Sequence, residues 1–334
     1  MNLKEKNMMR MNDCVELVMT VGIPGSGKSS LTIEYEESGY RVHSSDLIRK
    51  ELYGNEEIQG KASQVFGVLG QRVRADLKAG RSCVIDATNL SRRRRKAMLT
   101  TLAKHADRKT CIIVLASPSV CMERNAARGR KVPPETIYRI LCSFETPYYY
   151  EGWDKIEMVY NGEPYVFPRE EAAELSQDNP HHTLTLGAHL DAARDYCVSH
   201  DFPAEVCEAA WYHDTGKLYT KRFMNKRGEP TEFAHFYGHE NYSAYLYLCE
   251  KAGALSEDSD LCVKTGETCV TSGEASDAAP SERILYIANL INWHMNPLNK
   301  WQRSPASEEK DRSLMGEAMY RDLMLLHQAD LEAH

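Results

Sequence analysis

The chain has 334 residues, of which 42% are hydrophobic and 27% charged, and this length favours two globular domains. No apolar run reaches the length of a membrane span, the N-terminus lacks the apolar core of a signal peptide, and the ten cysteines contain no C-x-x-C pair. These features exclude a membrane protein, a secreted disulfide framework and a zinc ribbon, and we expect a cytoplasmic protein with free thiols.

The formal net charge of −7 is unevenly distributed along the chain. Residues 1–165 hold 26 Lys and Arg against 20 Asp and Glu, whereas residues 166–334 hold 15 against 28. We therefore expect a polyanion to dock on the first half. The acidic second half can still act on phosphates if it holds metal ions.

The first half alternates segments typical of strands and helices. This rhythm predicts an α/β domain over residues 1–165, in which helices flank a parallel sheet. Helices are expected at 58–77 and 92–106, among others. The expected strands are Val15–Val21, Arg41–Ser44, Cys83–Asp86, Thr110–Ala116 and Ile156–Tyr160.

The second half has a different pattern. Residues 166–180 are polar and predict a linker, and residues 181–334 predict an all-helical domain without a convincing strand. Residues 254–280, rich in small and polar side chains, predict a mobile surface insertion. The expected helices cover residues 181–197, 204–212, 237–252, 281–293 and 313–332.

A phosphate-binding loop follows the first expected strand. Residues 22–29 read GIPGSGKS and match the pattern G-x-x-x-x-G-K-[ST] between a strand and a helix. Backbone N–H groups of such a loop cradle a polyphosphate. We predict that Lys28 reaches the outer phosphates of ATP or another NTP and that the Ser29 hydroxyl binds the accompanying Mg²⁺. Further nucleotide contacts are expected from Gly22, Gly25, Ser26, Gly27 and Ser30.

Acidic side chains follow the next two strands. Asp46 and Arg49 stand in the run SSDLIR, where Asp46 could accept the proton of an attacking hydroxyl and Arg49 could hold a substrate phosphate. An N-cap of the following helix is the alternative for Asp46. Asp86 stands in the run VIDATN and could contact Mg²⁺ or substrate, although a plain strand-end cap fits equally well.

Two basic runs complete the first half. Residues 92–96 read RRRRK on an expected helix, which fits either a solvated face or a contact to a nucleic-acid backbone. The run ERNAARGRKVPP places Arg124, Arg128 and Arg130 at a helix end, where they could close over the transferred phosphoryl group.

Four of these motifs over residues 14–165 together resemble the 5′-hydroxyl polynucleotide kinase branch of the P-loop phosphotransferases: the phosphate-binding loop and the runs SSDLIR, VIDATN and ERNAARGRKVPP. The resemblance implies Asp46 as the general base, Arg49 as a contact to the substrate 3′-phosphate, and Arg124 and Arg128 as lid residues near the donor phosphates. Zeta-toxin-like and other small-metabolite kinases share much of this core, so the acceptor stays open.

Histidines and carboxylates recur through the second half. Neutral imidazoles combined with carboxylates suit a divalent transition metal such as Mn²⁺, Fe²⁺, Co²⁺, Ni²⁺ or Zn²⁺. One helical histidine is more often structural, but several separated ones require one fold to bring them together. The residues in question are His189, His213, Asp214, His239, His294 and Asp330.

The pattern H…HD…D, here His189, His213-Asp214 and Asp330, resembles the HD phosphohydrolase superfamily over residues 178–334. The resemblance implies one or two metal ions, with His239 and His294 as the extra ligands of two-metal members and Asp214 as the bridge. Lys217 could bind a phosphate oxygen or could simply be an exposed lysine. Asp322 is the alternative to Asp330, which stands close to the chain end, and His235 is expected to support the ligands.

A kinase and a phosphohydrolase in one chain together predict the healing of broken nucleic-acid ends, with RNA as the leading substrate. In this hypothesis the chain phosphorylates a 5′-OH and removes a 2′,3′-cyclic or 2′-phosphate, so that a ligase, such as an RNA ligase partner, can join the ends. One alternative is that both activities act on small nucleotides or metabolites. The other is a regulatory NTP sensor whose HD domain is inactive.

Overall fold

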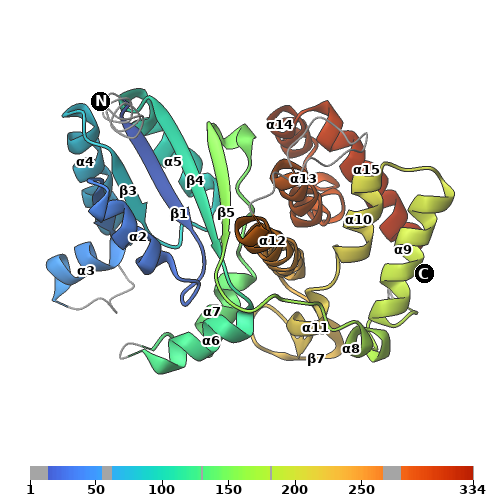
Figure 1. The fold of residues 1–334 in the computed structure, drawn as a ribbon. Coiled ribbons are helices and arrows are strands. Elements are labelled where there is room, and N and C mark those ends of the chain that lie inside the picture. Colours follow the sequence, from blue (N-terminus) through green and yellow to red (C-terminus); the bar gives the residue numbers. More distant parts are fainter. Residues whose placement is uncertain (1–13, 55–61, 129–130, 181–182, 266–279, 334) are drawn as a thin grey trace. The chain divides into compact units, whose positions relative to one another are not determined.

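A computed structural model describes residues 14–54, 62–128, 131–180, 183–265 and 280–333 (Figure 1). The chain divides into two compact units, one formed by Met1–Val132 and Pro147–Asn161, the other by Pro133–Thr146 and Gly162–His334. The second unit therefore includes helix α7 (Pro134–Leu141), which lies before the expected division near residue 165.

The first unit is built on a five-stranded parallel sheet of order β2-β3-β1-β4-β5, which confirms the α/β prediction. The central strand pairs on both sides, with Leu17 opposite Cys83 of β3 and Lys109 of β4. Because helices cover such a sheet, its central strands read as continuous apolar runs, and this made them recognisable. The strands are β1 (Glu16–Val21), β2 (Arg41–Ser44), β3 (Cys83–Asp86), β4 (Arg108–Leu115) and β5 (Lys155–Tyr160).

Helices flank this sheet (Figure 1). On α4, Val65, Leu69, Val73 and Leu77 are buried and spaced by four, so they form one apolar stripe. In a parallel sheet the carboxyl ends of the strands share one edge, which collects the loops after β1, β2 and β3. The helices are α2 (Lys28–Glu37), α3 (Ser45–Tyr53), α4 (Ala62–Lys78), α5 (Arg92–Leu102) and α6 (Pro118–Ala127), with 3₁₀ turns at Ala103–His105 and Tyr149–Glu151.

The second unit is mainly helical, and helix α10 (Ala204–Tyr212) lies at its centre. This helix contacts α9, α12, α13 and α15 and buries Val206, Ala209, Ala210, Trp211 and Tyr212. The other elements are α8 (Arg169–Glu174), α9 (Leu186–Ser199), α11 (Lys217–Thr220), α12 (His239–Thr265), α13 (Pro280–Trp293), a π-helical turn (Pro297–Trp301), α14 (Pro305–Met315) and α15 (Glu317–Glu332).

One expectation for this unit was wrong, because two short strands form an antiparallel hairpin. Strands β6 (Arg222–Met224) and β7 (Pro230–His235) pair Arg222 with His235. They escaped prediction because they are short and largely exposed, so they lack an alternating buried face. The reversal between them uses Gly228 at φ 82°, a conformation that favours glycine.

Three segments differ in extent from the sequence expectation. The polar stretch 166–180 was expected to be a linker but contains helix α8. This helix packs closely on α9, because a Cβ on Gly187 of α9 would lie 2.7 Å from the Cα of Ala173. Helix α12 continues through Thr265, and residues 266–279 of the expected insertion lie outside the described residues. Gly316, at φ 83°, separates α14 from α15, where one helix was expected.

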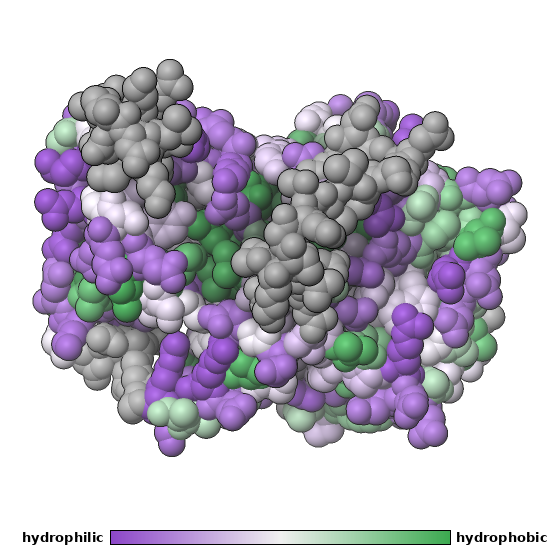
Figure 2. All heavy atoms as spheres, in the orientation of Figure 1, coloured by the Kyte–Doolittle hydropathy of each residue, from purple (hydrophilic) through white to green (hydrophobic). Residues whose placement is uncertain are grey.

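Hydrophilic side chains cover most of the visible face of each unit, and the hydrophobic ones form small separate groups (Figure 2). Within the described ranges, every helix is too short or too polar to span a bilayer. The eight cysteines whose side chains are described are free thiols.

Candidate nucleotide site and metal centre

The phosphate-binding loop connects β1 to α2 and requires glycine at several positions. Gly25 and Gly27 adopt φ values of 91° and 102°. A Cβ on Gly27 would lie 1.9 Å from Asn161 Nδ2, and one on Gly22 would lie 2.5 Å from the carbonyl oxygen of Val114. The backbone can therefore take this shape only without side chains at these positions.

Lys28 is held inside the loop. Its Nζ donates to the carbonyl oxygens of Gly22 at 2.9 Å and of Ile23 at 2.8 Å. Burial lowers the pKa of Lys28 to about 8, and the charge of Asp86 offsets part of this effect. The Ser26 hydroxyl is also buried and has no hydrogen-bond partner among the described residues. A phosphate oxygen would satisfy both groups, so the loop fits a polyphosphate.

The two expected strand-end carboxylates occupy different environments. On α3, Arg49 Nη1 donates to Asp46 Oδ1 at 2.5 Å, and the Asp46 side chain is 53% exposed. Asp46 is not the N-cap of α3, because this helix already begins at Ser45 and Ser44 takes the cap position. Burial raises the pKa of Asp86 at the end of β3, while Lys28 and Ser44 oppose that rise.

The expected lid arginines lie on and after α6. Arg124 donates to the carbonyl oxygen of Gly25 at 3.4 Å and to Asn161 Oδ1 at 3.5 Å, so it reaches the phosphate-binding loop. Arg128 is exposed at the end of α6, and its charge contributes to the low pKa of Lys28. Arg130 lies outside the described residues. Asn161 was missed by the sequence reasoning, although it follows β5 as Asp46 follows β2.

One arginine of the run 92–96 has a structural role. Arg95 is fully buried and binds Glu151 through two hydrogen bonds, Nε to Oε2 at 2.7 Å and Nη2 to Oε1 at 2.6 Å. Its Nη1 donates to the carbonyl oxygens of Asn89 and Leu90. Neither a solvated face nor a nucleic-acid contact therefore describes Arg95, because the guanidinium is needed inside the unit.

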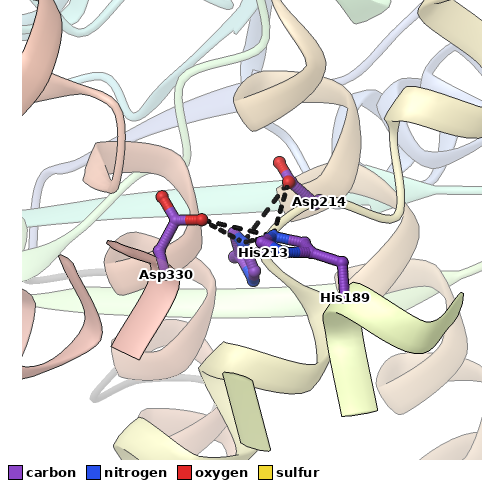
Figure 3. Close-up of side chains that lie close together, drawn as sticks. All are labelled: His189, His213, Asp214 and Asp330. Carbon is purple, nitrogen blue, oxygen red and sulfur yellow. Dashed lines mark hydrogen bonds and ion pairs between the residues drawn. The ribbon is translucent and has the colours of Figure 1, made fainter. Parts of the chain in front are cut away.

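The six expected metal ligands of the second unit converge, although they come from five segments. Their ligand atoms form two groups, and within each group these atoms lie within 4.8 Å of one another. The first ligand group is His189, His213, Asp214 and Asp330 (Figure 3). The second ligand group is Asp214, His239 and His294. His189 lies on α9, His213 and Asp214 follow α10, His239 begins α12, His294 follows α13, and Asp330 lies on α15.

The four histidines share one orientation. In each ring Nδ1 lies 2.7 Å from a backbone carbonyl oxygen, of Ala333, Ala210, Phe236 and Ile291 respectively. In the neutral ring these contacts assign the proton to Nδ1 and leave Nε2 as the lone-pair atom. The Nε2 atoms of His189 and His213 are 3.2 Å apart, and those of His239 and His294 are 3.3 Å apart. Lone pairs this close repel one another unless a cation lies among them, so both pairs fit metal ligands.

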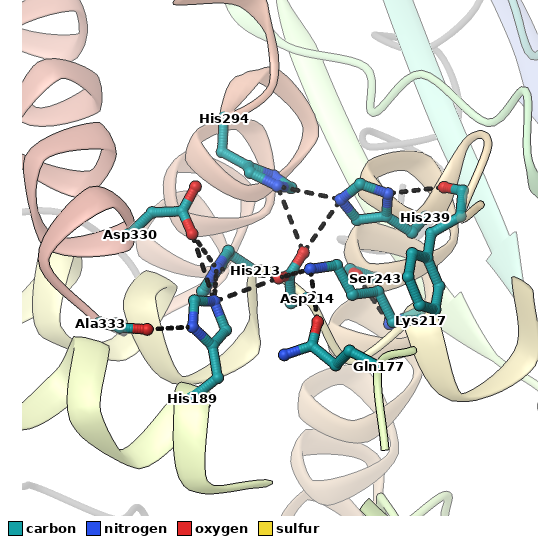
Figure 4. Close-up of polar contacts among 12 residues, drawn as sticks. Gln177, His189, His213, Asp214, Lys217, His239, Ser243, His294, Asp330 and Ala333 are labelled. Atoms are coloured by element: carbon teal, nitrogen blue, oxygen red, sulfur yellow. Dashed lines mark hydrogen bonds and ion pairs between the residues drawn. The ribbon is translucent and has the colours of Figure 1, made fainter. Parts of the chain in front are cut away.

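Asp214 connects the two ligand groups (Figure 4). Its Oδ2 lies 3.3 Å from His189 Nε2 and 3.4 Å from His213 Nε2. Its Oδ1 lies 2.9 Å from His239 Nε2 and 3.6 Å from His294 Nε2, and it is buried without a hydrogen-bond donor among the described residues. One carboxylate oxygen thus faces each group, as expected of a bridging ligand.

Electrostatics in the first ligand group also favour a cation. Burial lowers the pKa of His213, but Asp214 and Asp330 outweigh burial and raise it to about 10. Burial alone would raise the pKa of Asp330, yet His213 and His189 hold it well below its usual range. Positive charge is stabilised between these residues, and the donor set of imidazole nitrogens and carboxylate oxygens suits a divalent transition metal.

Lys217 and Gly216 support Asp214. Lys217 is 4% exposed, and its Nζ lies 2.6 Å from Asp214 Oδ2 and donates to Gln177 Oε1 at 2.9 Å, so it is not an exposed surface lysine. A Cβ on Gly216 would lie 2.4 Å from the carbonyl oxygen of His239, and its N–H donates to Ser243 Oγ. Glycine at this position therefore lets the turn after Asp214 approach α12.

Other candidates do not join the centre. Asp322 accepts a hydrogen bond from Tyr286 at 2.7 Å and stands outside both ligand groups, whereas Asp330 lies in the first. His235 stacks on Tyr237 and belongs to neither group. In the first unit, His43, Asp76 and Cys83 also lie close together. There Arg81 already pairs with Asp76, and burial raises the pKa of Cys83 to about 12, so a thiolate ligand is disfavoured.

Comparison with known proteins shows that the N-terminal part of the chain is similar to P-loop kinases. Residues 17–147 match the family described as AAA domain, a range that includes the phosphate-binding loop but ends before the histidines of the second unit. The L-seryl-tRNA(Sec) kinase of Methanococcus maripaludis is 24% identical over 183 residues, which are 51% of this chain and 68% of that protein.

Parts of the chain are also similar to solved structures. The Pnkp1/Rnl/Hen1 complex matches with 23% identity and a TM-score of 0.32 over 34% of this chain and 39% of that chain. A gluconokinase from Sinorhizobium meliloti 1021 matches with 22% identity and a TM-score of 0.34 over 45% of this chain and 84% of that chain. This chain thus spans about two fifths of the Pnkp1/Rnl/Hen1 complex chain that it matches.

Proposed function

We propose that this chain, whose first unit is a P-loop kinase-like domain, acts on both ends of broken nucleic acid, with RNA as the leading substrate. It phosphorylates 5′-OH ends and removes 2′,3′-cyclic or 2′-phosphates at the opposite ends. The observation that carries this proposal is the pair of ligand groups sharing Asp214 in a chain that also holds the phosphate-binding loop. Phosphate chemistry is thereby supported at two separate sites.

In the kinase reaction, Asp46 accepts the proton of the attacking 5′-OH. The γ-phosphoryl group of Mg²⁺-bound NTP passes to that oxygen as its bond to the β-phosphate oxygen breaks and NDP leaves. Arg49, whose Nη1 donates to Asp46 Oδ1, binds a substrate phosphate in this proposal. Lys28 leaves its two carbonyl partners for the outer phosphates of the NTP. Arg124 and Arg128 neutralise charge that develops on the transferred group.

In the phosphohydrolase reaction, the two ligand groups would hold two divalent transition metal ions, with one Asp214 oxygen for each. When bound, such a pair supplies an activated water and neutralises the phosphate under attack. Lys217 holds Asp214 Oδ2 in place at 2.6 Å. A direct contact of Lys217 with the phosphate requires it to release Gln177.

Metal content tests this assignment. Purified protein reconstituted with Mn²⁺ or Ni²⁺ should retain two ions per chain after desalting, measured by inductively coupled plasma mass spectrometry. His239→Ala should lose the ion of the second ligand group, His189→Ala that of the first, and Asp214→Ala both. His200→Ala, an exposed histidine of the same unit, is the matched control and should retain both. Retention of two ions by Asp214→Ala would overturn the shared-ligand arrangement.

A further inference from the structure

The hairpin of the second unit carries an unusual charge for its surroundings. Residues 221–237, here called the basic hairpin, hold four Lys and Arg against two Glu in the half of the chain that is otherwise acidic. Lys221 is already paired with Asp178 and Ser176. Arg222, Lys226 and Arg227 are exposed and form no ion pair among the described residues. The Arg222 guanidinium lies 4.6 Å from the centre of the Tyr138 ring, an arrangement that leaves its charge without an anionic partner.

The same segment exposes aromatic side chains. Phe223 is 45% exposed, Phe233 47% and Tyr237 38%. Aromatic side chains exposed to this extent contribute little to the fold, and three of them in one hairpin indicate a binding surface. Lys226 Nζ lies 5.0 Å from the centre of the Tyr237 ring, so cation and ring stand side by side. Alternation of cations with exposed rings is the composition of a surface that binds single-stranded nucleic acid.

Both ends of the basic hairpin lead to the metal centre. It begins directly after α11, whose first residue Lys217 contacts Asp214. At its other end, the carbonyl oxygen of Phe236 accepts the Nδ1 proton of His239, and the Phe236 ring lies 5.3 Å from Lys217 Nζ. Figure 1 shows β7 beside α11. A nucleic-acid strand bound along the hairpin would therefore lie next to the metal ligands.

We propose that the basic hairpin binds the single-stranded segment next to the phosphate end on which the metal centre acts. Bases stack on Phe223 and Phe233, and the backbone phosphates pair with Arg222, Lys226 and Arg227. This inference rests on the phosphohydrolase function proposed above and adds to it how the substrate strand is held. It places a nucleic-acid contact in the acidic half of the chain, where net charge alone would not predict one.

Binding of a fluorescein-labelled single-stranded RNA 12-mer without a terminal phosphate, followed by anisotropy on the full chain, tests the surface. Phe223→Ala/Phe233→Ala should weaken binding by about tenfold or more, because each lost stacking contact has an effect of this order. Lys226→Gln/Arg227→Gln should lower the slope of log Kd against the logarithm of the salt concentration by about one to two. Arg303→Gln/Lys310→Gln, two exposed cations elsewhere in the second unit, should change neither quantity. Unchanged metal content in every variant verifies that the unit is folded.

Activity separates this proposal from the function on which it rests. The aromatic variant should hydrolyse a nucleoside 2′,3′-cyclic monophosphate like wild type but show a KM raised by about tenfold on an oligonucleotide with the same end. If wild type binds the 12-mer through the hairpin yet hydrolyses neither phosphate, the proposed function fails and the binding surface stands. If both hairpin variants bind the 12-mer as tightly as wild type, the binding surface is refuted. Polyglutamate serves as a second probe, of an acidic protein. If the hairpin variants lose binding to polyglutamate but keep binding to the 12-mer, the binding surface for nucleic acid is also refuted, and an acidic protein partner is indicated.

Discussion

Lys28 links the phosphate-binding loop to a measurable pH dependence. Its pKa is lowered to about 8 by burial, and the charged form is the one that binds phosphate. Below this pH the side chain is charged, and above it the charge is lost. We therefore expect the Kd for Mg²⁺–ATP, measured by isothermal titration calorimetry, to rise by about tenfold or more between about pH 7.5 and 9.5.

Lys28→Arg is the control for this prediction, because arginine stays charged across the whole range. Its nucleotide affinity should be lower than that of wild type but independent of pH. A flat pH profile for wild type would show that the charge of Lys28 does not limit binding.

Arg95 gives a second prediction at a single residue. Arg95→Met leaves Glu151 buried without a cationic partner and should lower the free energy of unfolding by about 3–5 kcal/mol in urea titrations. Exposed Arg93→Met, two positions earlier, should change it by less than about 0.5 kcal/mol. Equal losses for the two variants would refute a structural role that is specific to Arg95.

Individual residues differ in how well the sequence predicted their positions. His213-Asp214 and Lys28 were recognisable because each lies in a short sequence motif whose residue types and spacing are set by its chemistry. Asp330 could not be separated from Asp322, since both lie on α15 and only packing decides which one reaches His189. Asn161 and the Arg95–Glu151 pair carry no local signal, because their partners are far away in sequence.

Gly216 determines how two helical elements meet. A Cβ at this position would press on the His239 carbonyl oxygen at 2.4 Å, and backbone cannot yield as a flexible side chain can. Gly216→Ala should therefore displace the start of α12 and reduce metal content from two ions to one, with a lower melting temperature. Gly67→Ala, in α4 with nothing within 4 Å of its added Cβ, should leave both quantities unchanged or slightly improve stability. Full metal content in Gly216→Ala would contradict the role of this close approach.

Burial made the central secondary-structure elements predictable. The central strands β1, β3 and β4 showed as apolar runs, and α10 has its expected limits. The β6–β7 hairpin was missed because its side chains are mostly exposed, and the break at Gly316 was missed because periodicity continues across it. Burial produces the pattern that sequence reasoning uses, so exposed elements leave little trace.

The proposed function predicts two kinds of metal dependence for the whole chain. The proposed kinase reaction needs only Mg²⁺ with its NTP, whereas the donor set of the two ligand groups suits transition metals. After removal of metal with a chelator, Mg²⁺ alone should restore 5′-phosphorylation of an oligonucleotide but not phosphate removal. Added Mn²⁺, Co²⁺ or Ni²⁺ should restore the second activity. Recovery of both activities with Mg²⁺ alone would contradict the assignment of a transition-metal centre.

The most direct test offers an RNA oligonucleotide with a 5′-OH and a 2′,3′-cyclic phosphate to wild type, Asp46→Ala and Asp214→Ala, and resolves the products by gel and mass spectrometry. Wild type should phosphorylate one end and remove phosphate from the other. Asp46→Ala should lose only the first activity and Asp214→Ala only the second. Turnover of mononucleotides but not oligonucleotides would make small nucleotides the substrates, and absence of both activities from wild type would contradict end healing.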